Sequence, residues 1–166
     1  MPLELYNPEL EDVHQPRTGA RILALDVGKK RIGLAVSDEL GFTAQGLETL
    51  QRTRIREDLG KLKHIAERWN VHTLLIGRPL HLSGDESRQS EYTKEFAQRL
   101  AKHLGLPLEF WDERLTSVEA DRVLRNAGAS LEQRKRSIDK LAAVLLLESY
   151  LEHQHLQEAQ MGESSA

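Results

Sequence analysis

The sequence predicts an α/β domain in which three antiparallel strands precede strands that alternate with helices. Three strand-like segments follow one another between residues 21 and 50, with turn signals between them and no helical periodicity. Further along the chain, short apolar runs at 71–76 and 106–111 are separated by stretches with helical spacing. Strands that alternate with helices form parallel sheets covered by those helices. We therefore expect the order βββ-α-β-α-β-α-α around a mixed five-stranded sheet.

The first three strands are predicted to form an antiparallel meander. Residues 21–27 are mostly apolar, which indicates a buried strand. Gly28 allows a tight turn, because glycine adopts torsions that other residues avoid. Residues 31–37 alternate between apolar and small or polar side chains, so this segment should pair antiparallel with the first. Residues 42–50 are expected to form the third strand.

A helix and a buried strand should follow the meander. Thr53 is expected to cap a helix that runs through Trp69, because threonine is a favoured N-cap residue. Apolar residues recur at helical spacing along this segment: Ile55, Leu59, Leu62, Ala66 and Trp69. Residues 71–76 are predicted to form an apolar strand.

The next helix is predicted from its capping signal. Ser83 and Glu86 have the spacing of a capping box, in which each residue bonds the backbone amide of the other. The helix should run to His103, and Gly105 should end it. Residues 106–111 are then expected to form the last strand.

Three more capping signals follow the last strand. Thr116 and Glu119 predict a helix that ends near Gly128. Ser130 is followed by a glutamine three residues later and suggests one more short turn. Ser137 is expected to cap a long final helix that carries buried leucines.

The composition predicts one domain with polar ends. Residues 1–19 hold three prolines and no periodicity, so we expect an extended or disordered arm. Residues 20–156 should form a single domain, since no internal repeat or linker interrupts them. Residues 157–166 are expected to be a disordered tail.

Composition excludes several classes of protein. No apolar run is long enough to cross a membrane, and the first residues lack the basic and apolar parts of a signal peptide. The chain has 0 cysteines, which excludes disulfides and thiolate metal sites. We therefore expect a cytoplasmic protein without a membrane partner.

The charge is distributed unevenly. The formal net charge is -3, of which residues 1–19 carry -3 and residues 153–166 carry -2. The body between them is left with +2. A positive body permits a polyanionic ligand without requiring one.

Three carboxylates on separate segments have the surroundings of a metal site. Asp26 comes at the end of the first strand, where α/β sheets collect their ligands. Glu113 follows the last strand by the same geometry, and Asp139 comes shortly after Ser137, in the first turn of the final helix. Several carboxylates held together bind divalent metals that cleave phosphodiesters.

Each acid also has an ordinary interpretation. Asp26 alone is compatible with an exposed hairpin turn, and Glu113 with a surface ion pair in an Asp-Glu-Arg turn. Asp139 is compatible with the routine occurrence of acids in first helical turns. The metal-site hypothesis therefore depends on all three meeting in space.

Basic residues gather near the same points of the sequence and are predicted to hold a phosphate backbone. In contrast, the run Arg52-Thr53-Arg54-Ile55-Arg56 is predicted to be a solvated helix face. Aromatic residues make up only 5% of the chain, which favours recognition of backbone and shape over base stacking. The candidate nucleic-acid-binding residues are Lys29, Lys30, Arg31, Arg78, Arg114, Arg125, Arg134, Lys135 and Arg136.

Four motifs in this order resemble those of a known family over about residues 21–152. They are Leu25-Asp26-Val27-Gly28 with Arg31-Ile32-Gly33-Leu34-Ala35, Gly77-Arg78-Pro79-Leu80 with Gly84, Asp112-Glu113-Arg114-Leu115-Thr116-Ser117, and Lys135-Arg136-Ser137-Ile138-Asp139-Lys140-Leu141-Ala142-Ala143. The chain resembles the YqgF/RuvX family of nucleases that process the precursor of small-subunit ribosomal RNA. It is more distantly similar to Holliday-junction resolvases of the RuvC type.

The resemblance implies a ribonuclease H-like fold and a hydrolase that depends on Mg²⁺ or Mn²⁺. It places the catalytic, metal-binding acids on Asp26, Glu113 and Asp139. It also implies processing of the 5′ end of pre-16S ribosomal RNA as the function. Related nucleases often use a fourth carboxylate, for which this chain offers only weak candidates: Asp38, Glu48 and Asp112.

Other functions stay open on the sequence alone. One is a nuclease of branched or single-stranded DNA, which for paired cuts in a junction would need a homodimer rather than a monomer. Another is a non-catalytic nucleic-acid-binding module, although acids near a polyanion would repel it. A third, less expected one is a nucleotide phosphotransferase, since Asp26-Val27-Gly28 before an antiparallel strand also resembles the phosphate loop of actin-like ATPases.

Overall fold

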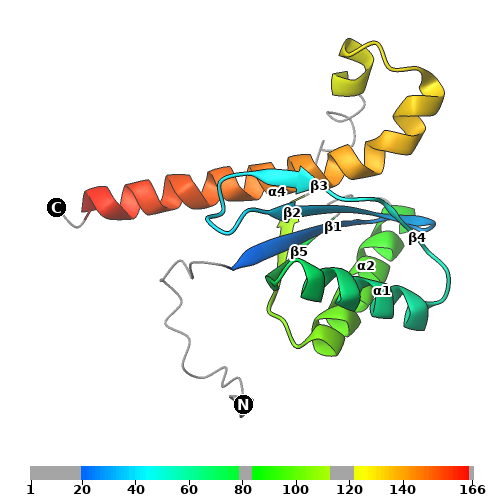
Figure 1. Ribbon diagram of the computed structural model, residues 1–166, viewed down its shortest axis with the longest axis horizontal. Coiled ribbons are helices and arrows are strands. Elements are labelled where there is room, and N and C mark those ends of the chain that lie inside the picture. Colours follow the sequence, from blue (N-terminus) through cyan, green and yellow to red (C-terminus); the bar gives the residue numbers. More distant parts are fainter. Residues whose placement is uncertain (1–19, 79–83, 113–121, 165–166) are drawn as a thin grey trace.

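The computed structural model describes residues 20–78, 84–112 and 122–164. Figure 1 shows a twisted sheet with the helices of residues 55–68 and 84–104 on one face and the long helix of residues 131–164 on the other. None of the helices within these ranges is long and apolar enough to cross a membrane. The predicted arm at 1–19 and the capping boxes begun by Ser83 and Thr116 lie outside the described residues.

The sheet has the predicted mixture of antiparallel and parallel strands. Strand β1 (Arg21–Val27) pairs antiparallel with β2 (Arg31–Ser37) and parallel with β5 (Val71–Arg78). Strand β6 (Leu108–Asp112) is parallel to β5, and the order across the sheet is β3-β2-β1-β5-β6. This confirms the α/β class, with β1 in the middle of the sheet.

The third strand of the meander differs from the prediction. In place of one strand over 42–50, two short strands, β3 (Ala44–Gly46) and β4 (Leu50–Gln51), both pair antiparallel with β2. Leu47 and Leu50 both pack in the same core, three residues apart. A continuous strand turns successive side chains to opposite faces, so it could not place both leucines in one core. Within the described ranges the sheet therefore has six strands instead of five.

Helices α1 (Ile55–Arg68) and α2 (Gly84–Leu104) cover one face of the sheet (Figure 1). The predicted apolar face of α1 is confirmed, because Leu59, Leu62 and Ala66 are buried in one core with β1, β2 and β5, and α2 contributes Phe96 and Leu100 to the same core. The main buried side chains of this core are Leu23, Leu25, Val27, Leu34, Leu62, Leu74, Ile76, Phe96 and Leu100.

The predicted cap of α1 is wrong by one residue. The N-cap is Arg54, which makes no side-chain cap hydrogen bond. Asp58 reaches back instead and accepts the backbone N–H of Thr53 at 3.0 Å. The Asp58 carboxylate, within the first turns of α1, therefore takes the place of the expected threonine hydroxyl as the hydrogen-bond acceptor at the start of the helix.

Helix α4 (Leu131–Ser164) covers the other face. Its buried side chains, among them Ala143, Leu146 and Leu147, pack on Ala24 and Leu75. Since side chains alternate along a strand and Leu25 and Val27 face the opposite core, the position of Asp26 is on the α4 side of the sheet. Figure 1 shows α4 starting near the end of the sheet where β1 ends and running back along it.

The start of α4 corrects another prediction. Ser130 donates its backbone N–H to Gln133 Oε1 at 2.9 Å, and Gln133 donates its own to Ser130 Oγ at 3.2 Å. This reciprocal pair is a capping box, so Ser130 and not Ser137 begins the helix. Asp139 therefore lies two turns inside α4, and the first-turn dipole argument does not apply to it. The helix continues to Ser164, through most of the predicted tail.

A Ser130→Ala substitution should loosen the first turn of α4. Loss of an N-cap costs about 1 kcal/mol, which raises local opening roughly fivefold. Hydrogen exchange of the Gln133 and Arg134 amides measures this opening. Ser137→Ala is the matched control and should leave exchange there unchanged, because alanine suits a helix interior. Greater loosening in the Ser137 variant would contradict the observed cap.

The close packing of α4 on β3 provides a second test. A Cβ atom on Gly46 would lie 2.7 Å from Lys140 Cε, 2.9 Å from its Cγ and 3.2 Å from Val144 Cγ2. Gly46→Ala should therefore push the helix away and lower the free energy of unfolding by about 1–3 kcal/mol, as overpacking does. Urea denaturation measures the change.

Gly60→Ala is the control for this substitution. Gly60 lies in α1 with open space around the position of a Cβ atom. Alanine there should raise the free energy of unfolding by about 0.4–1 kcal/mol, because it restricts the unfolded chain and favours the helix. Equal effects of the two substitutions would show that α4 does not approach β3 closely.

Candidate functional site

Asp26 lies where the strand register brings three strand ends together. Leu25, Ile76 and Phe110 are aligned across β1, β5 and β6. Asp26 is the next residue in β1, so the same register sets it beside the residues that follow Ile76 in β5 and Phe110 in β6. Because the three strands are parallel, all of them end at this edge of the sheet. The predicted place of Asp26, at the carboxyl end of a central strand, is confirmed.

Glu113 itself lies outside the described residues, but the strand that leads to it is described. Strand β6 ends at Asp112, which is paired with Arg78 at the end of β5. The described strand therefore ends, at Asp112, at the same edge of the sheet as Asp26. The side chain of Asp112 is also outside the described part of the structure.

The backbone position of Asp139 is on α4, one turn before two buried alanines. Ala142 and Ala143 are 1% and 0% exposed. Residues three and four apart share a helix face, so the Asp139 position is on the side of α4 that covers the sheet. Lys140 and Val144, which flank this stretch of α4, lie over Gly46 of β3. The two buried alanines thus lie where α4 packs on the sheet.

The turn after Asp26 requires glycine at its first position. Gly28 donates its N–H to the carbonyl of Arg31 at 2.9 Å. A Cβ atom on Gly28 would lie only 2.8 Å from that carbonyl oxygen, closer than real Cβ contacts. The predicted tight turn is confirmed, but glycine is needed there for this close approach and not for a left-handed torsion. The turn exposes Lys29 and Lys30 beside the end of β1.

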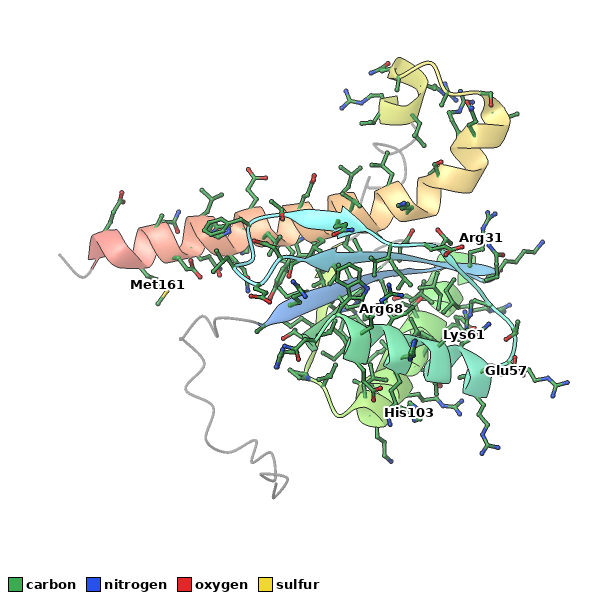
Figure 2. All side chains as sticks on the ribbon, viewed as in Figure 1. Arg31, Glu57, Lys61, Arg68, His103 and Met161 are labelled. Carbon is green, nitrogen blue, oxygen red and sulfur yellow. The ribbon has the colours of Figure 1, made fainter. Side chains whose placement is uncertain are left out.

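Four of the predicted basic residues lie at this edge. Lys29 and Lys30 are in the turn, Arg31 begins β2, and the exposed Arg78 ends β5. Figure 2 shows Arg31 at this end of the sheet. The structure therefore places a basic rim from β2 to β5 around Asp26.

The other predicted basic residues belong to later segments. Arg125 is exposed in a helical segment at 122–126, and Arg134 is half-buried in the first turn of α4. Lys135 and Arg136 are in the next residues of that helix, but their side chains lie outside the described part. Arg114 is also outside it.

Asp38, a weak candidate for a fourth carboxylate, is at the wrong end of the sheet. It follows β2, whose last residue Ser37 accepts the N–H of Ile22 near the start of β1. Its carboxylate accepts the backbone N–H groups of Phe42 at 2.7 Å and Thr43 at 2.9 Å. Slight desolvation raises the pKa of Asp38, but the hydrogen bonds from Thr43 and Phe42 outweigh it, so the pKa is lower than usual. Asp38 thus holds a loop together.

Glu48 is exposed in the interruption between β3 and β4. Strand β2 separates it from β1, so about 10 Å of sheet lies between the two backbones, at roughly 4.8 Å per strand. Among the residues that the structure describes, no group of three histidine or acidic side chains could hold a metal. The site of Asp26, Glu113 and Asp139 therefore stays a prediction.

Arg52 differs from its prediction. It was predicted to be solvated, yet its side chain is only 8% exposed. Its Nη1 donates to the carbonyl of Gly28 at 2.9 Å, and its Nε lies 3.6 Å from Asp58 Oδ2. The available signal was Asp58, an acid on the apolar stripe of α1 between Ile55 and Leu62. A charge on such a stripe needs a buried partner.

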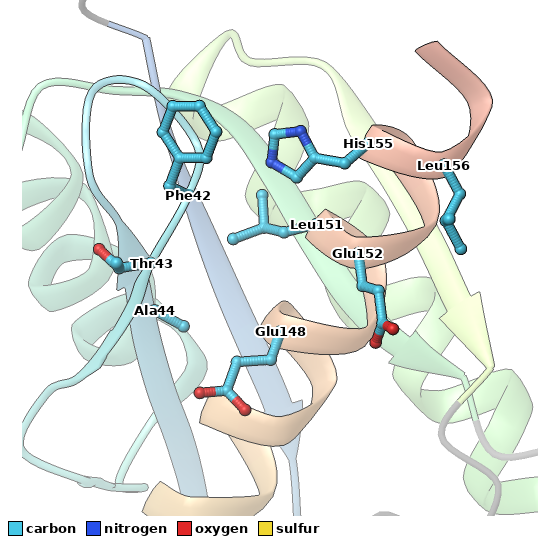
Figure 3. A pocket seen from close by; sticks show the side chains of 8 residues that line it. All are labelled: Phe42, Thr43, Ala44, Glu148, Leu151, Glu152, His155 and Leu156. Atoms are coloured by element: carbon cyan, nitrogen blue, oxygen red, sulfur yellow. The ribbon is translucent and has the colours of Figure 1, made fainter. Parts of the chain in front are cut away.

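A surface hollow lies elsewhere, between the β2–β3 loop and the second half of α4 (Figure 3). Its volume is about 650 Å³. Phe42 stacks on His155 with ring centroids 4.9 Å apart, and His155 Nε2 lies 2.9 Å from the carbonyl oxygen of Gly41. This hollow is at the end of the sheet opposite to Asp26, so it is separate from the predicted acid site.

Comparisons with known proteins agree with this arrangement. The family model for RuvX, described as Holliday junction resolvase, matches residues 20–153. A protein of Koribacter versatilis named "Putative pre-16S rRNA nuclease" is 52% identical over 132 residues, which cover 80% of this chain and 86% of that protein. A Symbiobacterium thermophilum protein of the same name is 46% identical over 132 residues, or 80% and 92% of the two chains.

The solved structure of T. thermophilus RuvC in complex with Holliday junction substrate has a similar fold. The TM-score is 0.51 at 15% sequence identity, and the match covers 82% of this chain and 96% of that one. At this identity the similarity concerns the fold alone, and it confirms the expected ribonuclease H-like architecture. Together with the match over residues 20–153, these findings show that the chain belongs to the RuvX family.

Proposed function

We propose that this protein is a divalent-metal-dependent nuclease that processes the 5′ end of pre-16S ribosomal RNA. The observation that carries the proposal is the shared edge of β1, β5 and β6, where Asp26 and the chain leading to Glu113 arrive together. Helix α4 adds the Asp139 position on the same side of the sheet. The names of the relatives supply the substrate.

The donor set suits a hard divalent cation. Carboxylate oxygens are the ligands that Mg²⁺ and Mn²⁺ prefer. Asp26 is half-buried at the end of a strand, so its carboxylate retains access to solvent and substrate. Asp26, Glu113 and Asp139 would hold the metal. When bound, such ions activate water and stabilise the oxygen that leaves in phosphodiester hydrolysis.

The basic rim would position the substrate. Exposed cations at Lys29, Lys30 and Arg78 lie where a phosphate backbone would pass the end of β1. Contacts to phosphates fix the position and orientation of a nucleic acid without reading its sequence. Further contacts are assigned to Arg31, Arg114, Arg125, Arg134, Lys135 and Arg136, as the sequence predicted. Substrate choice would then depend on shape and on the placement of the scissile bond.

Cleavage of branched DNA is the second candidate, favoured by the description of the matching family as Holliday junction resolvase. Two symmetric cuts would require two copies of the chain related by a two-fold axis. The backbone contacts above serve RNA and DNA alike, so the substrate has to be decided by experiment. For either substrate we propose a cytoplasmic enzyme.

Asp26→Asn should abolish metal-dependent cleavage, because the amide removes a charged metal ligand. We expect a loss of at least about 100-fold, since even changes to outer-shell partners of metals cost 10- to 100-fold. The assay uses end-labelled 16S precursor RNA, single-stranded DNA and a four-way DNA junction, each with Mg²⁺, Mn²⁺ or EDTA. Cleavage should require the metal, disappear in EDTA and be fastest on the RNA.

Asp38→Asn is the matched control. It changes the same residue type in the same hairpin, but at the end of the sheet away from the site. Its cleavage rate should stay near that of the wild type. Full activity of Asp26→Asn would exclude the metal-site assignment. Binding of nucleic acid without cleavage in any metal would favour the non-catalytic module, and preference for the junction would favour the resolvase.

A further inference from the structure

Arg52 joins the turn after Asp26 to the body of the domain. It directly follows β4, and its own backbone N–H donates to the carbonyl of Lys30 at 2.9 Å. Its side-chain Nη1 donates to the carbonyl of Gly28 at 2.9 Å. One residue therefore bonds two carbonyls of the same turn, one through the backbone and one through the guanidinium.

The guanidinium is in turn held by a buried acid. Asp58 is 1% exposed, and its Oδ2 lies 3.6 Å from Arg52 Nε. The other oxygen of Asp58 accepts the backbone N–H of Thr53 at 3.0 Å and its hydroxyl at 3.3 Å. Buried charges persist only when paired and hydrogen-bonded. The Asp58 carboxylate thus fixes the direction in which Arg52 points.

Two aromatic rings of α2 complete the surroundings of Arg52. Its Cζ atom lies 5.1 Å from the ring centroid of Tyr92 and 4.8 Å from that of Phe96. Cations are attracted to aromatic faces at such distances, more strongly when water is excluded. Arg52 consequently links the β1–β2 turn to both α1 and α2, which are anchored in the main core.

These contacts bear on Asp26 through a short piece of backbone. Gly28 comes two residues after Asp26, and its N–H and carbonyl are both bonded, to Arg31 and to Arg52. A guanidinium presents several N–H groups in a rigid planar fork, so it can bond Gly28 and Asp58 at the same time. The end of β1 cannot move relative to α1 without breaking one of these bonds.

We propose that Arg52 is a positioning residue of the nuclease site. It is too buried to touch a substrate, and it acts by fixing the turn that sets the place of the Asp26 carboxylate and of Lys29 and Lys30. The part of this inference that concerns metal rests on the proposed function. Arg52 lies on a segment outside the motifs that hold the three acids, and the geometry of the site depends on its charged side chain.

Arg52→Lys tests the proposal. Lysine keeps the positive charge beside Asp58, but its single ammonium cannot reproduce the fork that spans Gly28 and Asp58. Hydrogen exchange of the Gly28 amide should rise about tenfold, with no change in the amides of the second half of α1. The Kd for Mn²⁺ alone, measured by calorimetry, should rise about 10-fold, in the range found for outer-shell changes.

Cleavage kinetics supply a third measurement. In Arg52→Lys the metal concentration for half-maximal cleavage should shift upward by the same factor, while thermal unfolding stays near that of the wild type. Arg54→Lys is the matched control, since Arg54 is exposed two residues away and makes no side-chain cap bond. It should behave as the wild type in all three measurements.

A second variant keeps the proposal testable if Arg52→Lys does not fold. Arg52→Met combined with Asp58→Asn removes both buried charges, and such paired replacements are often tolerated. It should show the same faster exchange at Gly28 and the same weaker Mn²⁺ binding. Unchanged exchange at Gly28, or unchanged Mn²⁺ affinity, in whichever variant folds would overturn the positioning role.

The two proposals fail in different ways. A wild type that neither binds Mn²⁺ nor cleaves any substrate overturns the proposed function and, with it, the role of Arg52 at a metal site. A wild type that binds Mn²⁺ and cleaves, with Arg52→Lys equal to it, overturns the positioning role alone.

Discussion

The parallel pairing of β1, β5 and β6 is the constraint on which the rest of the structure depends. It aligns strands that are far apart in the sequence, so that their carboxyl ends meet at one edge. The strands are fixed from both faces, since Ala24, Leu25 and Leu75 are all 0% exposed. A shift of one strand would carry apolar side chains out of a core. The core therefore fixes the three strands up to the edge that holds Asp26.

Two further contacts tie neighbouring elements to this edge. Helix α4 packs closely on the sheet, since Gly46 leaves room for the side chains of Lys140 and Val144, and Ala142 and Ala143 are buried. On the other face, the buried pair of Arg52 and Asp58 holds the β1–β2 turn against α1. A metal site built from separate segments needs such supports, because ligands must be fixed by groups around them.

Much of the fold could be predicted from the sequence, because local pattern and tertiary environment agree for β1, β2 and β5. The failures have physical causes. The third strand is interrupted because Leu47 and Leu50 both enter one core, a requirement that alternation within the segment does not reveal. Ser130 and Ser137 are both acceptable N-cap residues by type. In the structure Ser130 is the cap, and α4 continues through Ser137.

At the site, the position of Asp26 at the end of a strand could be predicted, because it is a charged residue in an apolar run. The burial of Arg52 could not be predicted from its local sequence. Its burial depends on Asp58, on the turn at Gly28 and on the rings of α2, which are distant in sequence. Charge runs are usually solvated, so the local pattern favoured exposure.

The most direct test of the account is where Mn²⁺ binds in the ¹⁵N-labelled protein. Bound Mn²⁺ broadens the NMR signals of nearby amides. We predict that low Mn²⁺ broadens the amides around Asp26, Glu113 and Asp139 together, and leaves those around Asp38 sharp. Broadening confined to one of the three segments, or spread evenly over the acidic surface, would contradict a shared metal site at the edge of the sheet.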